Sequence, residues 1–226
     1  MKKKFLILIL LFITIFATNA CDNKKINDAS LAFKEEYESL NGKTNKNGKI
    51  HRTVSIDEFN PYEKVTASDI LNKIENKETF YVYFGDKLCP WCRSVIEKSI
   101  EVANKNNISK IYYVNIWDDE GNEILRDKHT LVDGEISKII EGTSEYKQLL
   151  EIFDNLLTEY TITDQEGNKI EVGEKRIYAP NFIYVKNGKP VKITEGISSK
   201  QKDAREELTS EILKDEEELF TKFLNN

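Results

Sequence analysis

Two unbroken aromatic and β-branched runs constrain the fold of this chain most strongly: "FYVYF" at 80–84 and "IYYVNI" at 111–116. Aromatic and β-branched runs of this length are typical of strands buried on both faces, as in a sheet covered by helices. Between them, residues 89–107 carry apolar side chains at a helical spacing. A strand, a helix and a strand in this order predict a parallel pair with a right-handed crossover. The expected fold class is therefore α/β.

Weaker local signals outline the rest of the chain. Cap residues and helical spacing predict three more helices, at 66–77, at 144–160 and from about 198 to the C-terminus. Turn residues between β-type runs predict three hairpins, with turns at Asp133-Gly134, near Gly167 and at Asn187-Gly188. Together with the strand-helix-strand unit, they indicate one folded domain over 51–226.

The first twenty residues have the pattern of an export signal. Three lysines precede an apolar run from Phe5 to Ala17, interrupted only by Thr14. A helix that spans a bilayer needs about 20 apolar residues, so this shorter run favours a signal peptide at 1–20 over a retained membrane anchor. Outside the cytoplasm, disulfides can form and persist.

Cys21 follows the signal directly, in the stretch "TNAC". This stretch resembles the lipobox of bacterial lipoproteins, although Thr18 stands where that family usually has Leu. The resemblance implies that Cys21 is lipidated and becomes the N-terminus of the mature protein; plain cleavage after Ala20 is the alternative. An odd cysteine in an exported chain otherwise needs a partner, which favours lipidation.

Residues 21–50 are rich in Lys, Asn, Asp and Gly, so we expect a partly ordered tether between the lipid and the folded domain. Apolar residues at positions 31, 33, 37 and 40 predict a short helix within it that docks on the domain. The whole chain has a formal charge of −6, and removal of the signal takes away three lysines. This acidic balance argues against nucleic acid as a partner.

The pair Cys89 and Cys92 stands where the first strand ends and the helix begins. Pro90 suits the first helical position, which places Cys89 at the N-cap. Unpaired backbone N–H groups and the helix dipole favour an anion there, so we expect an exposed Cys89 with a lowered pKa. Cys92 shares the helix stripe that faces the core. Lys87 and Arg93 flank the pair, as ordinary solvated charges or with a specific role.

Other uses of two cysteines fit this chain less well. A structural zinc site needs four ligands, and the only histidines, His51 and His129, stand far apart in the sequence. Attachment of haem needs His directly after the second cysteine, where this chain has Arg93. No metal or other cofactor is therefore expected. A structural disulfide that never turns over stays as the alternative to a redox pair.

With a buried strand, the cysteine pair and a helix in this order, residues 51–117 and 178–224 resemble a thioredoxin-fold oxidoreductase. The "CPWC" motif follows a buried strand and opens a helix, and its Pro-aromatic pair is of the glutaredoxin and disulfide-oxidase kind. The segment "YAPNFIYVKNGKPVKITEGISSK" resembles the thioredoxin segment of cis-proline, hairpin, glycine and last helix. The layout, with its tether and "EKRIYAPN", is similar to thioredoxin-like lipoproteins of low-GC bacteria, some linked to bacteriocin transport.

The resemblance implies a three-layer fold with a mixed sheet, in which Pro180 is a cis-proline facing the cysteines. It implies that the backbone of Ala179 pairs with the substrate and that Trp91 offers an apolar contact at the helix tip. Two departures stand out. Tyr83 occupies the position of a buried Asp that assists proton transfer in thioredoxins, so we expect water or Asp86 to take that part. Residues 118–178 form an insertion before the cis-proline strand, either near the substrate face or extending the sheet.

The function expected from these features is that of a thiol-disulfide oxidoreductase, anchored by its lipid on the extracytoplasmic face of the cell membrane. The Cys89-Cys92 disulfide would be its redox centre. Its partners would be exported cysteine-containing proteins and a membrane redox protein. The alternative is a non-catalytic adapter or transport accessory lipoprotein of the same fold, in which the two cysteines form a fixed disulfide.

Overall fold

The computed structural model describes residues 27–225. The expected signal peptide and Cys21 lie outside the described residues. Within them, no helix is both long enough and apolar enough to cross a bilayer.

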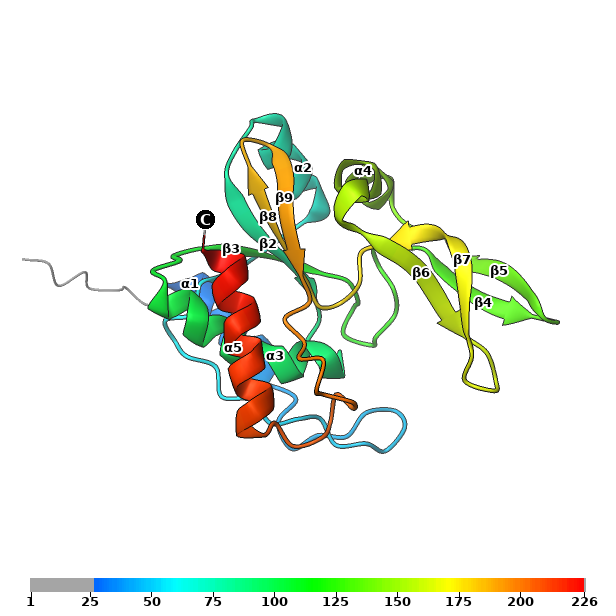
Figure 1. Cartoon of the computed structure of the whole chain (residues 1–226), viewed down its shortest axis with the longest axis horizontal. Coiled ribbons are helices and arrows are strands. Elements are labelled where there is room, and N and C mark those ends of the chain that lie inside the picture. Colours follow the sequence, from blue (N-terminus) through cyan, green and yellow to red (C-terminus); the bar gives the residue numbers. More distant parts are fainter. Residues whose placement is uncertain (1–26, 226) are drawn as a thin grey trace, which may run out of the picture.

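A five-stranded mixed sheet in the order β1-β3-β2-β8-β9 forms the centre of the molecule (Figure 1). Strands β1, β3 and β2 run parallel, whereas β8 and β9 pair antiparallel beside β2. Their bounds are Tyr62–Val65 (β1), Phe80–Gly85 (β2), Ile111–Asn115 (β3), Asn181–Lys186 (β8) and Lys189–Thr194 (β9). The predicted parallel pair, β2 with β3, and the α/β class with a mixed sheet are confirmed.

Helices cover both faces of this sheet, so the fold has three layers (Figure 1). On β2 every residue is buried, and alternate side chains enter two different cores. Tyr81 and Tyr83 pack with α1, α3 and α5, while Phe80, Val82 and Phe84 pack with α2 and α4. The helix bounds are Asp28–Glu38 (α1), Ala67–Glu75 (α2), Pro90–Lys105 (α3), Ser144–Phe153 (α4) and Ser210–Leu224 (α5).

Helix α1 lies inside the segment expected to be a tether, and it docks on the domain as predicted. Its apolar side chains Phe33 and Tyr37 are buried in the core. The Asn60 side chain donates to the Ser30 carbonyl at 2.8 Å, which ties the helix to the chain leading into β1. The helix is therefore part of the folded body.

The insertion at 118–178 builds two hairpins and α4. The hairpins are β4 (Lys128–Val132) with β5 (Glu135–Ile140), and β6 (Thr158–Thr163) with β7 (Lys169–Arg176). Each forms a two-stranded sheet of its own, and both project to one side of the central sheet (Figure 1). The insertion therefore does not extend that sheet, which was one of the two arrangements expected.

Two helix boundaries and one strand differ from the sequence predictions. The helix predicted over 144–160 ends at Phe153 and passes through a short 3-10 helix, η1 (Asp154–Leu156), into β6. The run from Thr158 is rich in β-branched and aromatic residues, and pairing with β7 decides its conformation. The C-terminal helix begins at Ser210 because the Thr209 hydroxyl caps it. The four-residue edge strand β1 was not predicted.

Candidate functional site

Cys89 occupies the N-cap of α3, as the sequence predicts, with Pro90 as the first helical residue. The pKa of the Cys89 thiol is lowered, first by a hydrogen bond from the Cys92 thiol. The backbone N–H groups of Cys92 and Trp91 contribute next to the lower pKa, because they point at the sulfur from the first turn of the helix. Cys89 is therefore the sulfur that becomes a thiolate more easily.

Cys92 has the opposite environment. Its side chain is completely buried, and burial raises the pKa of its thiol, as do the hydrogen bond and the charge of Cys89. Both cysteines are free thiols in the structure. One dithiol therefore contains an acidic sulfur and a protonated one, an asymmetry that suits an attacking and a resolving thiol.

The prediction that Cys89 is exposed was wrong, because its side chain is only 5% exposed. The cover comes from a segment far away in the sequence: the Cys89 Sγ lies 3.4 Å from the Ala179 carbonyl oxygen. A helix tip looks open when only its own residues are considered. Here the chain before β8 closes over it.

The covering segment contains a cis peptide bond between Ala179 and Pro180, as expected from the sequence. Pro180 is buried and Ala179 is half-buried. Two contacts fix the segment, since the Tyr178 N–H donates to the Asn181 side chain at 2.7 Å and the Tyr178 hydroxyl donates to the Glu159 carbonyl at 2.9 Å. The structure thus brings Ala179 to Cys89.

Trp91 is half-buried in the first turn of α3 and packs against the core on the α1, α3 and α5 face. The expected contact at the helix tip is therefore geometrically available.

Tyr83 lies behind the cysteines on β2, completely buried. Its hydroxyl hydrogen-bonds to the hydroxyl of Tyr37 on α1 at 2.8 Å, and its proximity to Cys92 acts against the raised pKa of that thiol. The sequence identified Tyr83 only as a departure from the buried Asp of thioredoxins, and it did not identify Tyr37 as a residue of the site. The apolar stripe of α1 could have indicated that Tyr37 faces the core, but nothing local connects it to the thiols.

Asp86 follows β2 directly and is completely buried. One carboxylate oxygen accepts from the Leu88 N–H at 2.7 Å, and the other has no hydrogen-bond partner among residues 27–225. Burial raises the pKa of this carboxyl to about 7. The backbone N–H of Asp86, by contrast, acts against the raised pKa of the Cys92 thiol.

Arg93 is not a solvated surface charge. Its side chain is completely buried and donates to the carbonyl oxygens of Tyr37 and Arg52 and to the Asn41 side chain, each at 2.8 Å. It therefore fastens α1 and the segment after it to α3. Lys87 pairs with the exposed Asp119 at 2.7 Å.

Arg126, from the insertion, also reaches the site. It is 5% exposed, pairs with Glu123 at 2.7 Å and donates to the Ile177 carbonyl at 3.2 Å, just before the cis bond. Its charge is one of the causes that lower the pKa of Cys89. Sequence reasoning missed this residue because no motif marks it. The expectation that the insertion lies near the site agrees with this placement.

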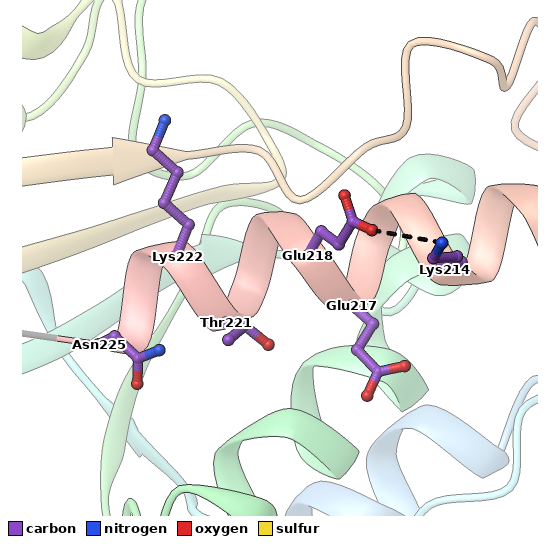
Figure 2. Close-up of a pocket in the computed structure, with 6 residues that line it drawn as sticks. All are labelled: Lys214, Glu217, Glu218, Thr221, Lys222 and Asn225. Atoms are coloured by element: carbon purple, nitrogen blue, oxygen red, sulfur yellow. Dashed lines mark ion pairs between the residues drawn. The ribbon is translucent and has the colours of Figure 1, made fainter.

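A hollow of about 430 Å³ lies along α5. Figure 2 shows its lining, in which Lys214 pairs with Glu218 at 3.8 Å. The other lining residues are Glu217, Thr221, Lys222 and Asn225. They are charged or polar side chains on the outer side of the helix, and the lining includes neither cysteine.

Within residues 27–225, no three His, Cys, Asp or Glu side chains are grouped to hold a metal ion. No protein-family model matches this chain. A comparison with curated proteins likewise found no match.

Proposed function

We propose that this protein is a thiol-disulfide oxidoreductase that acts on cysteines of exported proteins from the extracytoplasmic face of the membrane. One observation carries the proposal. A low-pKa Cys89 at the start of α3 lies against the Ala179 carbonyl, with the high-pKa Cys92 behind it. Disulfide exchange needs this pair of unequal thiols beside a backbone segment that can receive a substrate strand.

In the reducing direction, the Cys89 thiolate attacks a substrate disulfide, and one substrate sulfur leaves as a thiolate. Cys92 then attacks the Cys89 sulfur of the mixed disulfide, the second substrate sulfur leaves, and the Cys89-Cys92 disulfide remains. The oxidising direction runs through the same steps in reverse. A membrane redox partner would return the pair to its starting state.

The thioredoxin-like features support the proposal: the "CPWC" motif at the start of α3, after β2, and the cis Ala179-Pro180 bond directly before β8. The location rests on the lipobox-like stretch at Cys21, outside the described residues. With Cys21 lipidated, the folded body would stand on the membrane where exported chains emerge.

The test is to trap the substrates. Cells that make the full chain with Cys92→Ala should accumulate mixed disulfides between Cys89 and exported proteins, because no second thiol releases them. The variant with both Cys89→Ala and Cys92→Ala is the matched control and should trap none. If nothing is trapped, and the wild type neither reduces nor oxidises a model peptide, the enzyme proposal is wrong. A reduction potential below about −300 mV would then indicate a fixed structural disulfide in an adapter protein.

A further inference from the structure

We propose that Tyr83 is a catalytic group of the cysteine site, where its hydroxyl donates a hydrogen bond to the Cys92 sulfur as this sulfur becomes a thiolate. Tyr37 acts as a positioning residue that holds the Tyr83 hydroxyl. This inference rests on the proposed function, since it assigns a role in its second step.

Three buried groups line up from α3 to α1: Cys92, Tyr83 and Tyr37, all packed in the same core. The Tyr83 hydroxyl hydrogen-bonds to the Tyr37 hydroxyl at 2.8 Å, and its proximity acts against the raised pKa of the Cys92 thiol. All three side chains are completely buried. A hydroxyl has one proton to donate and can also accept, so Tyr37 can donate to Tyr83 while Tyr83 donates to Cys92.

The backbone of β2 leaves room for this contact at one residue. A Cβ at Gly85 would lie 2.1 Å from the hydroxyl oxygen and from the Cζ atom of Tyr83. Gly85 is on the same face of β2 as Tyr83, two residues towards the cysteines. The absence of a side chain at Gly85 therefore lets the phenol extend over the strand end.

Neighbouring rings hold the phenol in this position. Tyr83 stacks on Phe182 with ring centroids 4.5 Å apart and on Tyr113 at 5.4 Å. The Tyr62 ring meets it edge-on at 5.5 Å. These ring contacts restrict the phenol, which favours its hydroxyl as a preorganised donor.

A buried thiolate at Cys92 needs such a donor. Removing a charged sulfur from water is costly unless the charge is hydrogen-bonded, and a hydrogen bond to an ion is stronger than one between neutral groups. Burial keeps the pKa of Tyr83 well above its usual value, so the hydroxyl stays protonated and can donate a hydrogen bond.

The proposed step balances without another reagent. Cys92 loses its proton, its sulfur attacks the Cys89 sulfur, and the bond from Cys89 to the substrate sulfur breaks. The departing substrate sulfur takes up one proton, and the Cys89-Cys92 bond forms. Tyr83 stabilises the thiolate and keeps its own proton throughout.

Several titratable groups face Cys92 and Tyr83, and they enter any pH dependence of this step. They are Tyr37 and Glu36 on α1, Tyr62 on β1, Asp86 after β2, Cys89 on α3 and Tyr113 on β3. Water or Asp86 was the expected proton group, and one oxygen of the Asp86 carboxyl is held by the Leu88 N–H. The hydroxyl of Tyr83 is the side-chain group that favours the Cys92 thiolate, since it acts against the raised pKa of that thiol.

The experiment follows the two thiol steps separately with 5,5′-dithiobis(2-nitrobenzoate) and the purified, reduced full chain. Attack by Cys89 releases a first coloured thiolate, and attack by Cys92 on the resulting mixed disulfide releases a second. Tyr83→Phe should slow the second release roughly 10- to 100-fold, because it removes a hydrogen bond to a charged group. Its rate should also need a higher pH to reach half of its maximum, while the first release stays close to that of the wild type.

Three variants complete the measurement. Cys92→Ala gives the first release alone, together with any background from Cys21. Tyr62→Phe removes another buried hydroxyl of the same cluster, one that bonds to Ser99 at 2.7 Å, and should leave the second release unchanged. Tyr37→Phe should slow the second release by about 2- to 10-fold, with a pH shift in the same direction.

The inference is overturned if Tyr83→Phe leaves the second release and its pH profile unchanged, or if Tyr62→Phe slows it equally. Should Tyr83→Phe fail to fold, an unchanged second release and pH profile in Tyr37→Phe overturns it instead. The reagent reacts with the cysteine pair whatever its natural substrate is. A failed trapping experiment combined with a slowed second release therefore rejects the proposed function and keeps the role of Tyr83.

Discussion

The central sheet and the insertion differ in what holds them in place. Strand β2 is buried along its whole length between two apolar cores. The β4-β5 hairpin instead exposes Val132, Ile136 and Ile139, and the insertion is tied at its base by the buried ion pairs of Glu123 with Arg126 and Arg176. Tight packing fixes the position of the cysteines, while a few charged contacts bring the insertion to them. The two regions should therefore respond differently to mutation.

The largest effect is expected in the core of the sheet. Phe84→Ala should lower the free energy of unfolding by about 3–5 kcal/mol, because Phe84 is completely buried and the change leaves a cavity. Val132→Ala, on the exposed hairpin, should change it by less than about 0.5 kcal/mol. Urea unfolding of both variants checks the contrast, and equal losses would mean that the hairpin is as well packed as the sheet.

Breaking the ion pair at the base of the insertion should have the next largest effect. Glu123→Gln should cost about 3 kcal/mol of unfolding free energy, because it leaves Arg126 and Arg176 buried without their counter-charge. Glu101→Gln removes a half-exposed carboxylate from Lys98 and Lys105 and should cost less than about 1 kcal/mol. Similar losses for the two variants would contradict the structural role of the buried pair.

The Asp86 carboxyl, directly after β2, should make the stability of the folded protein depend on pH. Its pKa in the folded protein is about 7, above the value of 3.8 for a free carboxyl, so the folded state binds the proton more tightly. The stability from this proton is full below pH 3.8 and is lost as the pH rises to about 7.

Between pH 4 and 7 the wild type should therefore lose on the order of 2 kcal/mol that Asp86→Asn does not lose. Unfolding midpoints measured across this range test the difference. Parallel curves for the two proteins would exclude Asp86 as the cause. Glu216, a second buried carboxyl with a pKa of about 7, shifts both curves alike.

The smallest effect concerns the contact of the insertion with the site. Arg126→Gln should raise the pKa of Cys89, because the cation no longer favours its thiolate. Alkylation of Cys89 by iodoacetamide near pH 7 should then slow by about threefold. Lys138→Gln changes another charge of the insertion, paired with Asp127 at 3.3 Å, and serves as the control. Equal rates for Arg126→Gln and the wild type would separate the insertion from the chemistry of the site.

The sequence predicted the parts of the molecule that local patterns determine. The runs at 80–84 and 111–116 became β2 and β3, and Cys89 caps α3. The cover over Cys89 could not be predicted from the helix alone, because it comes from residues near the other end of the chain. The end of α4 was predicted too late because positions 156, 157 and 160 fit helical spacing as well as the start of a strand.

The partners of the two thiols were predicted least well. Tyr37 and Arg126 reach the site from elements whose own patterns describe only burial or charge. For Arg93 the sequence left a solvated charge and a specific role open, because its neighbours in sequence give no sign of the acceptors that surround it. Long-range contacts of polar side chains leave little periodic signal in a single sequence.

The closure of Ala179 over Cys89 has a consequence for how the protein is made. The covering residue follows the cysteine by 90 positions, with the whole insertion between them. The ribosome therefore adds both cysteines, β2 and α3 well before it adds the segment that covers Cys89. During that interval the nascent chain presents an uncovered cysteine pair, and only the nearly complete polypeptide can enclose it.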